Sequence, residues 1–247
     1  MGSVIAVSSG KGGTGKSTVT AGLGAALCRL GKKVLLMDMD EGLRCLDLLL
    51  GVSQKSLFDV SDILNGNCNA AQAVLQVSGY SGLYVLTAPV KIGTLDSVEA
   101  MRFLCEKFSD IFDFVIIDCP AGIDRGFYMA ASTAKNALVV ATPDPVSMRD
   151  AAIIDGLLEK SGVTKRRLVL NKILTRPMID GTLPNIDEMI DGTGIQLIAA
   201  IPTDNSVVLA GAQGKVIEHS IAADAFDRLA MRLLNIHVPL PNLRKIT

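Results

Sequence analysis

The sequence predicts a doubly wound α/β fold, in which helices flank both faces of a mostly parallel sheet. Short apolar runs recur along the 247 residues, and most of them are continuous rather than alternating. Continuous aliphatic runs are typical of strands that are buried on both faces, as parallel strands are. Amphipathic segments lie between these runs, and a regular alternation of strand and helix is the pattern of this architecture.

The predicted strands leave room for a helix between most of them. They are Val4–Ser8, Val34–Met37, Leu83–Thr87, Phe114–Ile117, Ala137–Ala141, Leu168–Leu170 and Leu197–Ile201. The main predicted helices are Ser17–Leu30, Ser97–Phe108, Val146–Lys160 and Ala222–Leu234. Gly31 is a natural stop for the first helix, because glycine readily adopts the left-handed conformation that ends a helix.

We expect one domain over residues 1–247, since α/β chains of this length often form a single core. The segment Thr175–Gly194 contains prolines and glycines, which predicts a surface excursion with a short helix around Ile186–Ile190. The apolar residues of Ala222–Leu234 have the spacing of a helix that packs on the domain's own core. Pro239 and Pro241 then oppose further helix, so we expect residues 235–247 to form a flexible tail.

The composition argues against several classes of function. The net charge is −1, so no overall positive field favours nucleic acid, and we do not expect DNA as a partner. The cysteines show no C-x-x-C pair and no zinc spacing, which favours free thiols in a reducing compartment. No apolar run reaches transmembrane length, and the chain enters a strand without a signal peptide. We therefore expect a cytoplasmic protein.

The strongest functional signal is a phosphate-binding loop. Residues 10–17 read G-K-G-G-T-G-K-S between a predicted strand and a predicted helix, which satisfies G-x-x-x-x-G-K-[ST]. Glycines let backbone N–H groups point at phosphate oxygens, and the following helix adds its positive end. Lys16 can neutralise the β- and γ-phosphates, and Ser17 can bind Mg²⁺. The predicted nucleotide contacts are Gly12, Gly13, Thr14, Gly15, Lys16, Ser17 and Thr18.

Three aspartates follow predicted strands at the same edge of the sheet. Asp38 and Asp40 come after the second strand, and Asp118 ends the fourth strand in V-I-I-D. The carboxyl ends of parallel strands face the ligand crevice, and an apolar strand that closes on aspartate places a carboxylate near Mg²⁺. We therefore expect the three carboxylates and Ser17 around Mg²⁺ and an attacking water. The alternative for each aspartate is a cap on a strand end or turn.

Asn171 follows the predicted strand Leu168–Leu170. A side-chain amide at that place can donate to adenine and accept from it at once. The alternative is a turn residue, which is the commoner role of an asparagine at the end of a strand. With the phosphate loop present, we predict that Asn171 contacts the base.

Lys11 is not required by an ordinary phosphate loop. With it, the loop resembles that of the deviant Walker A ATPases, the family that contains MinD, ParA and the nitrogenase iron protein. The resemblance covers nearly the whole chain and implies a Mg²⁺-dependent ATPase that binds ATP and ADP. In this family the equivalent lysine reaches across a nucleotide-sandwich homodimer to the partner's phosphates. The alternative for Lys11 is a solvated side chain beside the loop.

The same resemblance assigns further roles. It implies that Asp40 orients or activates the attacking water and that Asp38 supports a switch loop as well as the metal. It also implies that the segment from Pro202 to Asp204 packs beside adenine with backbone groups. In this reading Lys11, Lys16 and Asp40 are the catalytic residues, and hydrolysis rests on positioning and electrostatics.

Four stretches bring the resemblance closest to the MinD branch. They are S-G-K-G-G-T-G-K-S-T at 9–18, D-M-D-E-G-L-R-C-L-D at 38–47, D-C-P-A-G-I at 118–123 and P-D-P-V-S-M-R-D at 143–150. This branch implies an ATP-dependent dimerisation switch that places the division site and hydrolyses ATP slowly until a partner completes the site.

The branch also implies partners. MinC-like and MinE-like regulators would use the surfaces around Arg44 and Asp150, and the protein would attach peripherally to the inner face of the cell membrane. The alternative for Arg44 and Asp47 is exposed charge on a helix flank. Two features depart from the branch. Cys45 replaces the usual asparagine, and the proline-broken tail replaces the usual basic amphipathic helix, which leaves membrane binding open.

Two alternatives share the phosphate loop. One is a ParA-like or flagellar-number-type positioning ATPase, which in the partition case would bind DNA. The compact basic run Lys165–Arg167 could form the DNA-binding surface, although a solvated start of a strand explains this run equally well. Iron–sulfur delivery or electron transfer would need cysteine pairs at a subunit interface, and Cys105 and Cys119 are otherwise undistinguished.

Overall fold

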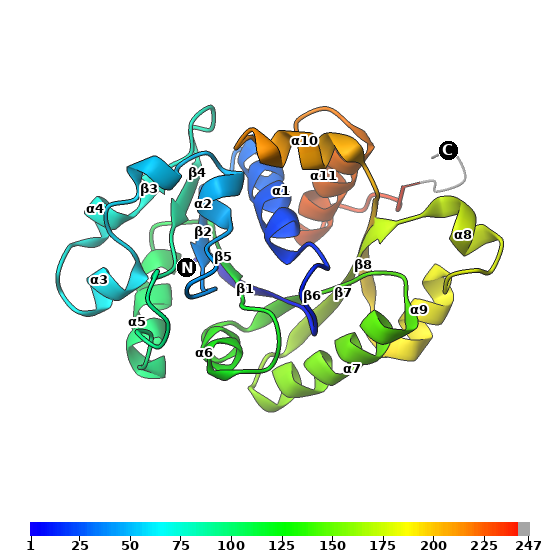
Figure 1. Ribbon diagram of the computed structural model, residues 1–247, viewed down its shortest axis with the longest axis horizontal. Coiled ribbons are helices and arrows are strands. Elements are labelled where there is room, and N and C mark those ends of the chain that lie inside the picture. The colour runs from blue at the N-terminus through cyan, green and yellow to red at the C-terminus, as the bar shows by residue number, and fades with distance from the viewer. Residues whose placement is uncertain (242–247) are drawn as a thin grey trace.

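The computed structural model describes residues 1–241, and its strands form one sheet (Figure 1). The strands are β1 Ser3–Ser8, β2 Val34–Asp38, β3 Leu75–Gln76, β4 Leu83–Leu86, β5 Phe114–Asp118, β6 Asn136–Ala141, β7 Lys165–Ile173 and β8 Leu197–Pro202. Their order across the sheet is β3-β4-β2-β5-β1-β6-β7-β8. Only the β3–β4 pair is antiparallel among the described strands, so the predicted doubly wound, mostly parallel sheet is confirmed.

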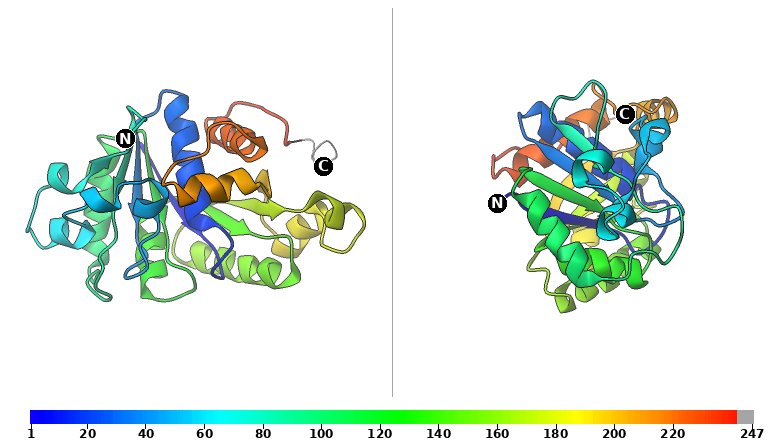
Figure 2. Two further views of the ribbon diagram at one scale, coloured as in Figure 1. Left: turned by 45° about the horizontal axis from the view of Figure 1, so that its top comes forward. Right: turned by 90° about the vertical axis from the view of Figure 1, so that its left-hand side faces the viewer.

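Helices cover both faces of this sheet, and Figure 2 shows the layers from two further directions. One face carries α1 (Lys16–Arg29), α2 (Leu46–Leu49), α10 (Asn205–Ala212) and α11 (Ile221–Leu233). The other face carries α5 (Val98–Ser109), α6 (Arg125–Thr133), α7 (Pro145–Lys160) and α9 (Ile186–Thr193). The short elements α3 (Val60–Leu64), α4 (Ala70–Ala73), α8 (Thr175–Ile179) and the 3₁₀ turn Ser53–Lys55 lie in the connections.

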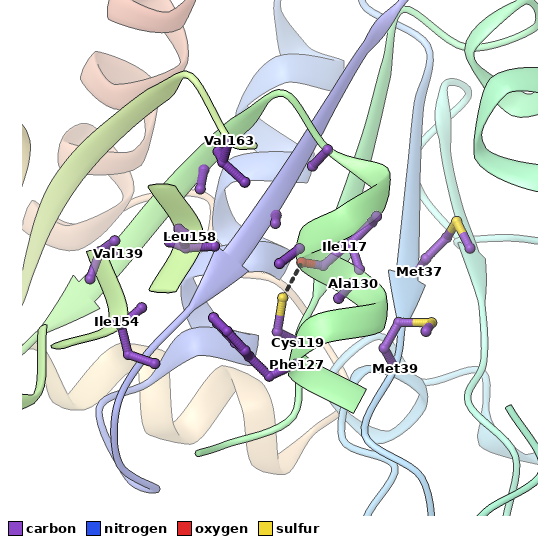
Figure 3. Packing of buried hydrophobic residues seen from close by; sticks show 14 of the residues in the cluster. Met37, Met39, Ile117, Cys119, Phe127, Ala130, Val139, Ile154, Leu158 and Val163 are labelled. Carbon is purple, nitrogen blue, oxygen red and sulfur yellow. Dashed lines mark hydrogen bonds between the residues drawn. The ribbon is translucent and has the colours of Figure 1, made fainter. Parts of the chain in front are cut away.

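Each face of the sheet has its own apolar core. Figure 3 shows part of the core beneath α6 and α7, where Phe127 and Ile154 pack on strand residues such as Ile117 and Val139. On the opposite face, Phe226 of α11 lies against Gly22 of α1, because a Cβ on Gly22 would be 2.6 Å from the ring. This close approach fixes α1, the helix that begins at the phosphate loop.

The predicted strands and main helices are confirmed, with ends that differ by a few residues. One boundary matters for the site: β7 continues to Ile173, so Asn171 lies within a strand, and the placement of Asn171 after the strand is wrong. The helices α2, α3, α4, α6, α8 and α10 and the strand β3 were not predicted. Most are under nine residues long, too short for a helical period to stand out from the sequence.

The final helix packs on the domain as predicted. Phe226 and Leu229 are buried, and Leu233 and Leu234 pack against the same core. After it, Arg228 donates to the Pro239 carbonyl at 3.0 Å, and Leu240 packs on the other core. Thus the first part of the predicted tail contacts the domain, whereas residues 242–247 lie outside the described residues. Within residues 1–241, no helix combines the length and apolar character needed to cross a membrane.

Candidate functional site

The site lies where the carboxyl ends of the central strands meet. β1 runs directly into the phosphate loop, and β5 is its neighbour, with Val7 opposite Asp118. β2 pairs with β5 in a register that sets Asp38 opposite Asp118. Because the strands are parallel and end at the same level, two carboxylates and the loop come together at one edge of the sheet.

The phosphate loop has the backbone that the glycine pattern predicts. Gly13 and Gly15 have φ angles of 82° and 89°, in the left-handed region that favours glycine. A Cβ on Gly13 would meet nothing within 4 Å, so this part of the loop faces open space. α1 then begins at Lys16, which is only 8% exposed. Backbone N–H groups, a helix N-terminus and a sequestered ammonium together form a cradle for phosphate.

The end of β7 supports this loop from behind. The Asn171 amide nitrogen donates to the Thr14 carbonyl at 2.8 Å, and the Lys172 ammonium donates to the Gly13 carbonyl at 2.7 Å. Lys172 adopts a φ of 56°, which is unusual for a residue with a side chain. The side-chain amide of Asn171, which we predicted to contact the base, therefore already donates one hydrogen bond to the loop. The predicted contact between Asn171 and adenine stays a prediction.

Asp38 organises the segment that follows β2. One carboxylate oxygen accepts the Asp40 N–H at 2.9 Å, and the other accepts the N–H groups of Cys45 and Leu46 at 3.0 and 3.1 Å. The side chain is fully buried. Burial raises the pKa of Asp38 despite these hydrogen bonds. Its expected support of a switch loop has this geometric basis, and its part in a metal shell stays a prediction.

Asp118 is buried beside Asp38 and α1. Its carboxylate accepts from the Thr20 hydroxyl at 3.5 Å. Burial, together with the negative charge of Asp38, raises the pKa of Asp118 to about 7, against the lowering effect of Lys16. Two adjacent buried carboxylates near one ammonium form a site that a further cation would stabilise.

This donor set fits Mg²⁺ bound with a nucleotide. Mg²⁺ takes oxygen ligands, keeps several waters, and is usually held by one or two carboxylates plus phosphate oxygens. Within residues 1–241, no three His, Cys, Asp or Glu side chains form a metal cage of their own. Ser17 at the start of α1 and the carboxylates of Asp38 and Asp118 would hold the ion together with phosphate.

Asp40 lies at the mouth of the site. It is partly buried, and burial raises its pKa, with Lys16 opposing the shift and Asp124 adding to it. Asp124 is the N-cap of α6 and accepts from the Phe127 N–H. The expected action of Asp40 on an attacking water stays a prediction.

Lys11 points away from the cradle that holds Lys16. Its ammonium lies 3.1 Å from both oxygens of Asp144, and the two side chains are 34% and 31% exposed. Asp144 is the N-cap of α7 and also accepts from Thr142 and from the Ser147 N–H. Burial would raise the pKa of Asp144, but these three partners outweigh it and lower that pKa. The alternative that Lys11 is a solvated side chain beside the loop is thus only partly right, because its ammonium is paired with Asp144.

The residues expected at regulator surfaces are more buried than expected. Arg44 pairs with Asp47 at 2.9 Å and donates to Ser56, while its Nε is buried without a partner among residues 1–241. The alternative that Arg44 and Asp47 are exposed charges is therefore wrong. Asp150 on α7 lies against the phosphate loop, since a Cβ on Gly10 would be 2.5 Å from the Asp150 Cβ.

The second predicted base segment follows β8. Pro202 ends this strand opposite Ile173, so it lies beside the end of β7 that carries Asn171. The Asp204 carboxylate caps α10 through the Ser206 N–H and also accepts the Ala222 N–H of α11. The fold therefore brings the predicted base contacts to one place next to the phosphate loop.

Sequence reasoning did not single out three residues of the site. Asp144 precedes Pro145, and an aspartate before a proline is a signature of a helix start, so the pattern could have identified it. Asp124 is also a helix cap, at the start of α6, but no proline follows it. Glu41 gives no signal in the sequence, because its partners lie more than fifty positions away.

Comparison with known proteins agrees with the geometry. The family model described as ParA, NUBPL iron-transfer P-loop NTPase, matches residues 1–234. The septum site-determining proteins MinD of Synechocystis sp. and Bacillus subtilis are 38% and 37% identical to this chain. The matches cover 97% and 99% of this chain and 92% and 94% of the relatives.

Solved structures give the same result. MinD in the MinC:MinD cell division protein complex of Aquifex aeolicus is similar at a TM-score of 0.90 and 33% identity, over 97% of this chain and 98% of that one. The septum site-determining protein MinD complexed with Mg-ADP from Pyrococcus horikoshii is similar at a TM-score of 0.85 and 27% identity, and the match covers 100% of this chain and 98% of that one. With a phosphate loop that contains Lys11, paired carboxylates at the strand ends and these likenesses, the chain belongs to the MinD branch of the ParA/MinD family of P-loop NTPases.

Proposed function

We propose that this protein is an ATP-hydrolysing dimerisation switch of MinD type that acts in placing the division site. Its relatives over nearly the whole chain carry the name septum site-determining protein. ATP would close two subunits around their phosphates, and hydrolysis would reopen them. A nucleotide can drive such a change only through different affinities for the two states.

The observation that carries the proposal is the separation of the two lysines. The Lys16 side chain is buried in the phosphate cradle, whereas the Lys11 side chain points out of that cradle and is held by Asp144. A second ammonium placed outside the cradle is available to a phosphate of another subunit. When bound, Mg²⁺ would neutralise phosphate charge. Lys16 would hold the phosphates, and Asp40 would orient the water or accept its proton.

Two variants test this function. Lys11→Ala should abolish ATP-dependent dimerisation while leaving nucleotide binding, and Asp40→Ala should hold the dimer because the bound ATP persists. Size-exclusion chromatography with ATP and with ADP measures both effects. A Lys11→Ala protein that still dimerises with ATP would contradict the dimer model. A wild-type protein with no ATPase activity, alone or with a regulator, would contradict the enzymatic one.

We propose MinC-like and MinE-like regulators as partners, on the faces around Arg44 and Asp150. A MinC:MinD complex is known for the Aquifex relative. Since Arg44 is largely buried in its pair with Asp47, contact would be made by its exposed neighbours Leu43 and Leu48. Peripheral membrane attachment at the inner face of the cell membrane belongs to the same proposal. Sedimentation with liposomes in ATP and in ADP tests it, and equal recovery in both would count against a switch.

The other candidate functions have less support from the described residues. In the basic run Lys165–Arg167, Arg166 is neutralised by Asp155 at 2.7 Å and Glu159 at 3.0 Å, which weakens its use as a DNA patch. Cys105 and Cys119, named above for iron–sulfur chemistry, are both buried in the core rather than available at a surface.

A further inference from the structure

Glu41 accepts a set of hydrogen bonds from the connection between β4 and α5. One carboxylate oxygen accepts the N–H groups of Thr94 and Leu95 and the Thr94 hydroxyl, each at 2.9 Å. The other accepts the Gly93 N–H at 2.9 Å. Three consecutive N–H groups thus converge on one charged side chain, and hydrogen bonds to an ionised acceptor are stronger than neutral ones.

The segment that receives Glu41 is itself fixed in the domain. Leu95 is buried in the core, and the Asp96 carbonyl accepts from Arg125 at the start of α6 at 2.7 Å. The Thr94 hydroxyl also lies 3.1 Å from the Lys91 carbonyl, which closes the turn upon itself. Glu41 is therefore attached to a part of the β4–α5 connection that packing and hydrogen bonds already hold in place.

Glu41 directly follows Asp40, so this attachment acts on the backbone of Asp40. On the N-terminal side, the Asp40 N–H is held by the Asp38 carboxylate. On the C-terminal side, Glu41 is held by residues 93–95, and the Gly42 N–H donates to the Pro89 carbonyl at 3.0 Å. The backbone of Asp40 is thus held on both sides by contacts with other parts of the domain.

We propose that Glu41 is a positioning residue for Asp40, which sets the direction of the Asp40 carboxylate toward the attacking water. This inference rests on the proposed ATPase function, in which Glu41 would affect the rate of hydrolysis through the position of Asp40. A shift of about 1 Å in a positioned group can cost about a hundredfold in rate. The alternative is that Glu41 only stabilises the β4–α5 connection and leaves the chemistry alone.

The two roles differ in which kinetic constant they change. ATP is bound by the phosphate loop, which Glu41 does not touch, whereas Asp40 acts on the water. Loss of Glu41 should therefore lower kcat about tenfold or more and leave KM for ATP within about twofold. A purely stabilising role would lower the melting temperature and leave kcat unchanged.

The experiment compares Glu41→Ala and Glu41→Gln with wild type in single-turnover hydrolysis of bound ATP, with the rate expressed per bound nucleotide. Normalising to bound ATP removes any misfolded fraction from the comparison. Glu41→Gln keeps the shape and one acceptor oxygen but turns a donor toward the Gly93 N–H. It should therefore give a rate between those of wild type and Glu41→Ala.

Glu188→Ala is the matched control. The Glu188 carboxylate also accepts a backbone N–H, that of Asn185 at the start of α9, but it lies in a segment remote from Asp40. It should lower the melting temperature without changing the rate per bound ATP. Equal rates for wild type and both Glu41 variants would overturn the positioning role while leaving the ATPase function intact. If wild type itself hydrolysed no bound ATP, the proposed function would fail instead.

Discussion

The ion pair between Lys11 and Asp144 gives a prediction about dimerisation. If Lys11 must reach a partner's phosphates, it first has to leave Asp144, so the pair opposes the closed dimer. Asp144→Asn removes this charge but keeps the helix cap, because asparagine and aspartate are equally good N-cap residues. The Ser147 N–H, at 2.9 Å from Asp144, retains an acceptor. The substitution should therefore strengthen ATP-dependent dimerisation rather than unfold α7.

The expected magnitude follows from the exposure of the pair. Both side chains are about one third exposed, at 34% and 31%, so the pair has the strength of a surface ion pair, about 0.5 kcal/mol. Two such pairs break when a symmetric dimer forms, which amounts to about 1 kcal/mol, or a dimerisation constant about fivefold higher in the variant. The gain should shrink at high salt, since exposed pairs are screened.

Sedimentation velocity with a non-hydrolysable ATP analogue measures this constant without interference from hydrolysis. Asp155→Asn is the matched control, because Asp155 lies on the same helix and also holds an ion pair, with Arg166, but has no contact with Lys11. It should leave the dimerisation constant unchanged. A weaker dimer for Asp144→Asn, or an equal gain for Asp155→Asn, would refute the view that Asp144 holds Lys11 back.

Three other predictions follow from single contacts. Gly22→Ala should lower stability by about 1–2 kcal/mol in urea unfolding, because its Cβ would lie 2.6 Å from the Phe226 ring and only part of that cost is regained as helix propensity. Asn171→Ala should weaken ATP binding about tenfold, measured by calorimetry, because the Thr14 carbonyl loses its hydrogen-bond donor. An equal loss of GTP affinity would mean that Asn171 makes no specific contact with adenine. Burial would raise the pKa of Glu41, but its hydrogen bonds outweigh this effect and lower the pKa below 4.5. The ionised Glu41 therefore stabilises the fold fully above pH 4.5, and this stabilisation is lost as the pH falls through the pKa that Glu41 has in the folded protein. The stability gap between wild type and Glu41→Gln should narrow on acidification, and a constant gap would contradict this assignment.

Much of the site could be predicted because its residues form local patterns. The glycines, Lys16 and Ser17 are contiguous, and the aspartates end apolar strands, so a pattern and a strand assignment were enough to identify them. Asp144 and Asp124 carry the weaker signature of a helix start. The sequence predicted Asn171 as a base contact just past a strand, whereas the extent of β7 and the hydrogen bond from Asn171 to the phosphate loop depended on pairing with distant strands.

The phosphate loop and the order of the predicted strands and main helices were determined by the sequence itself, because glycine conformation, apolar runs and helix signals are properties of neighbouring residues. The sheet order and register belong to the tertiary structure alone. They set Asp38 opposite Asp118 and bury both carboxylates, which raises the pKa of each, and the charge of Asp38 adds to the rise at Asp118. Contacts between segments far apart in the chain also give Lys11 its partner Asp144 and attach Glu41 to residues 93–95. No local pattern encodes such contacts, because they form only when packing closes the loops between them.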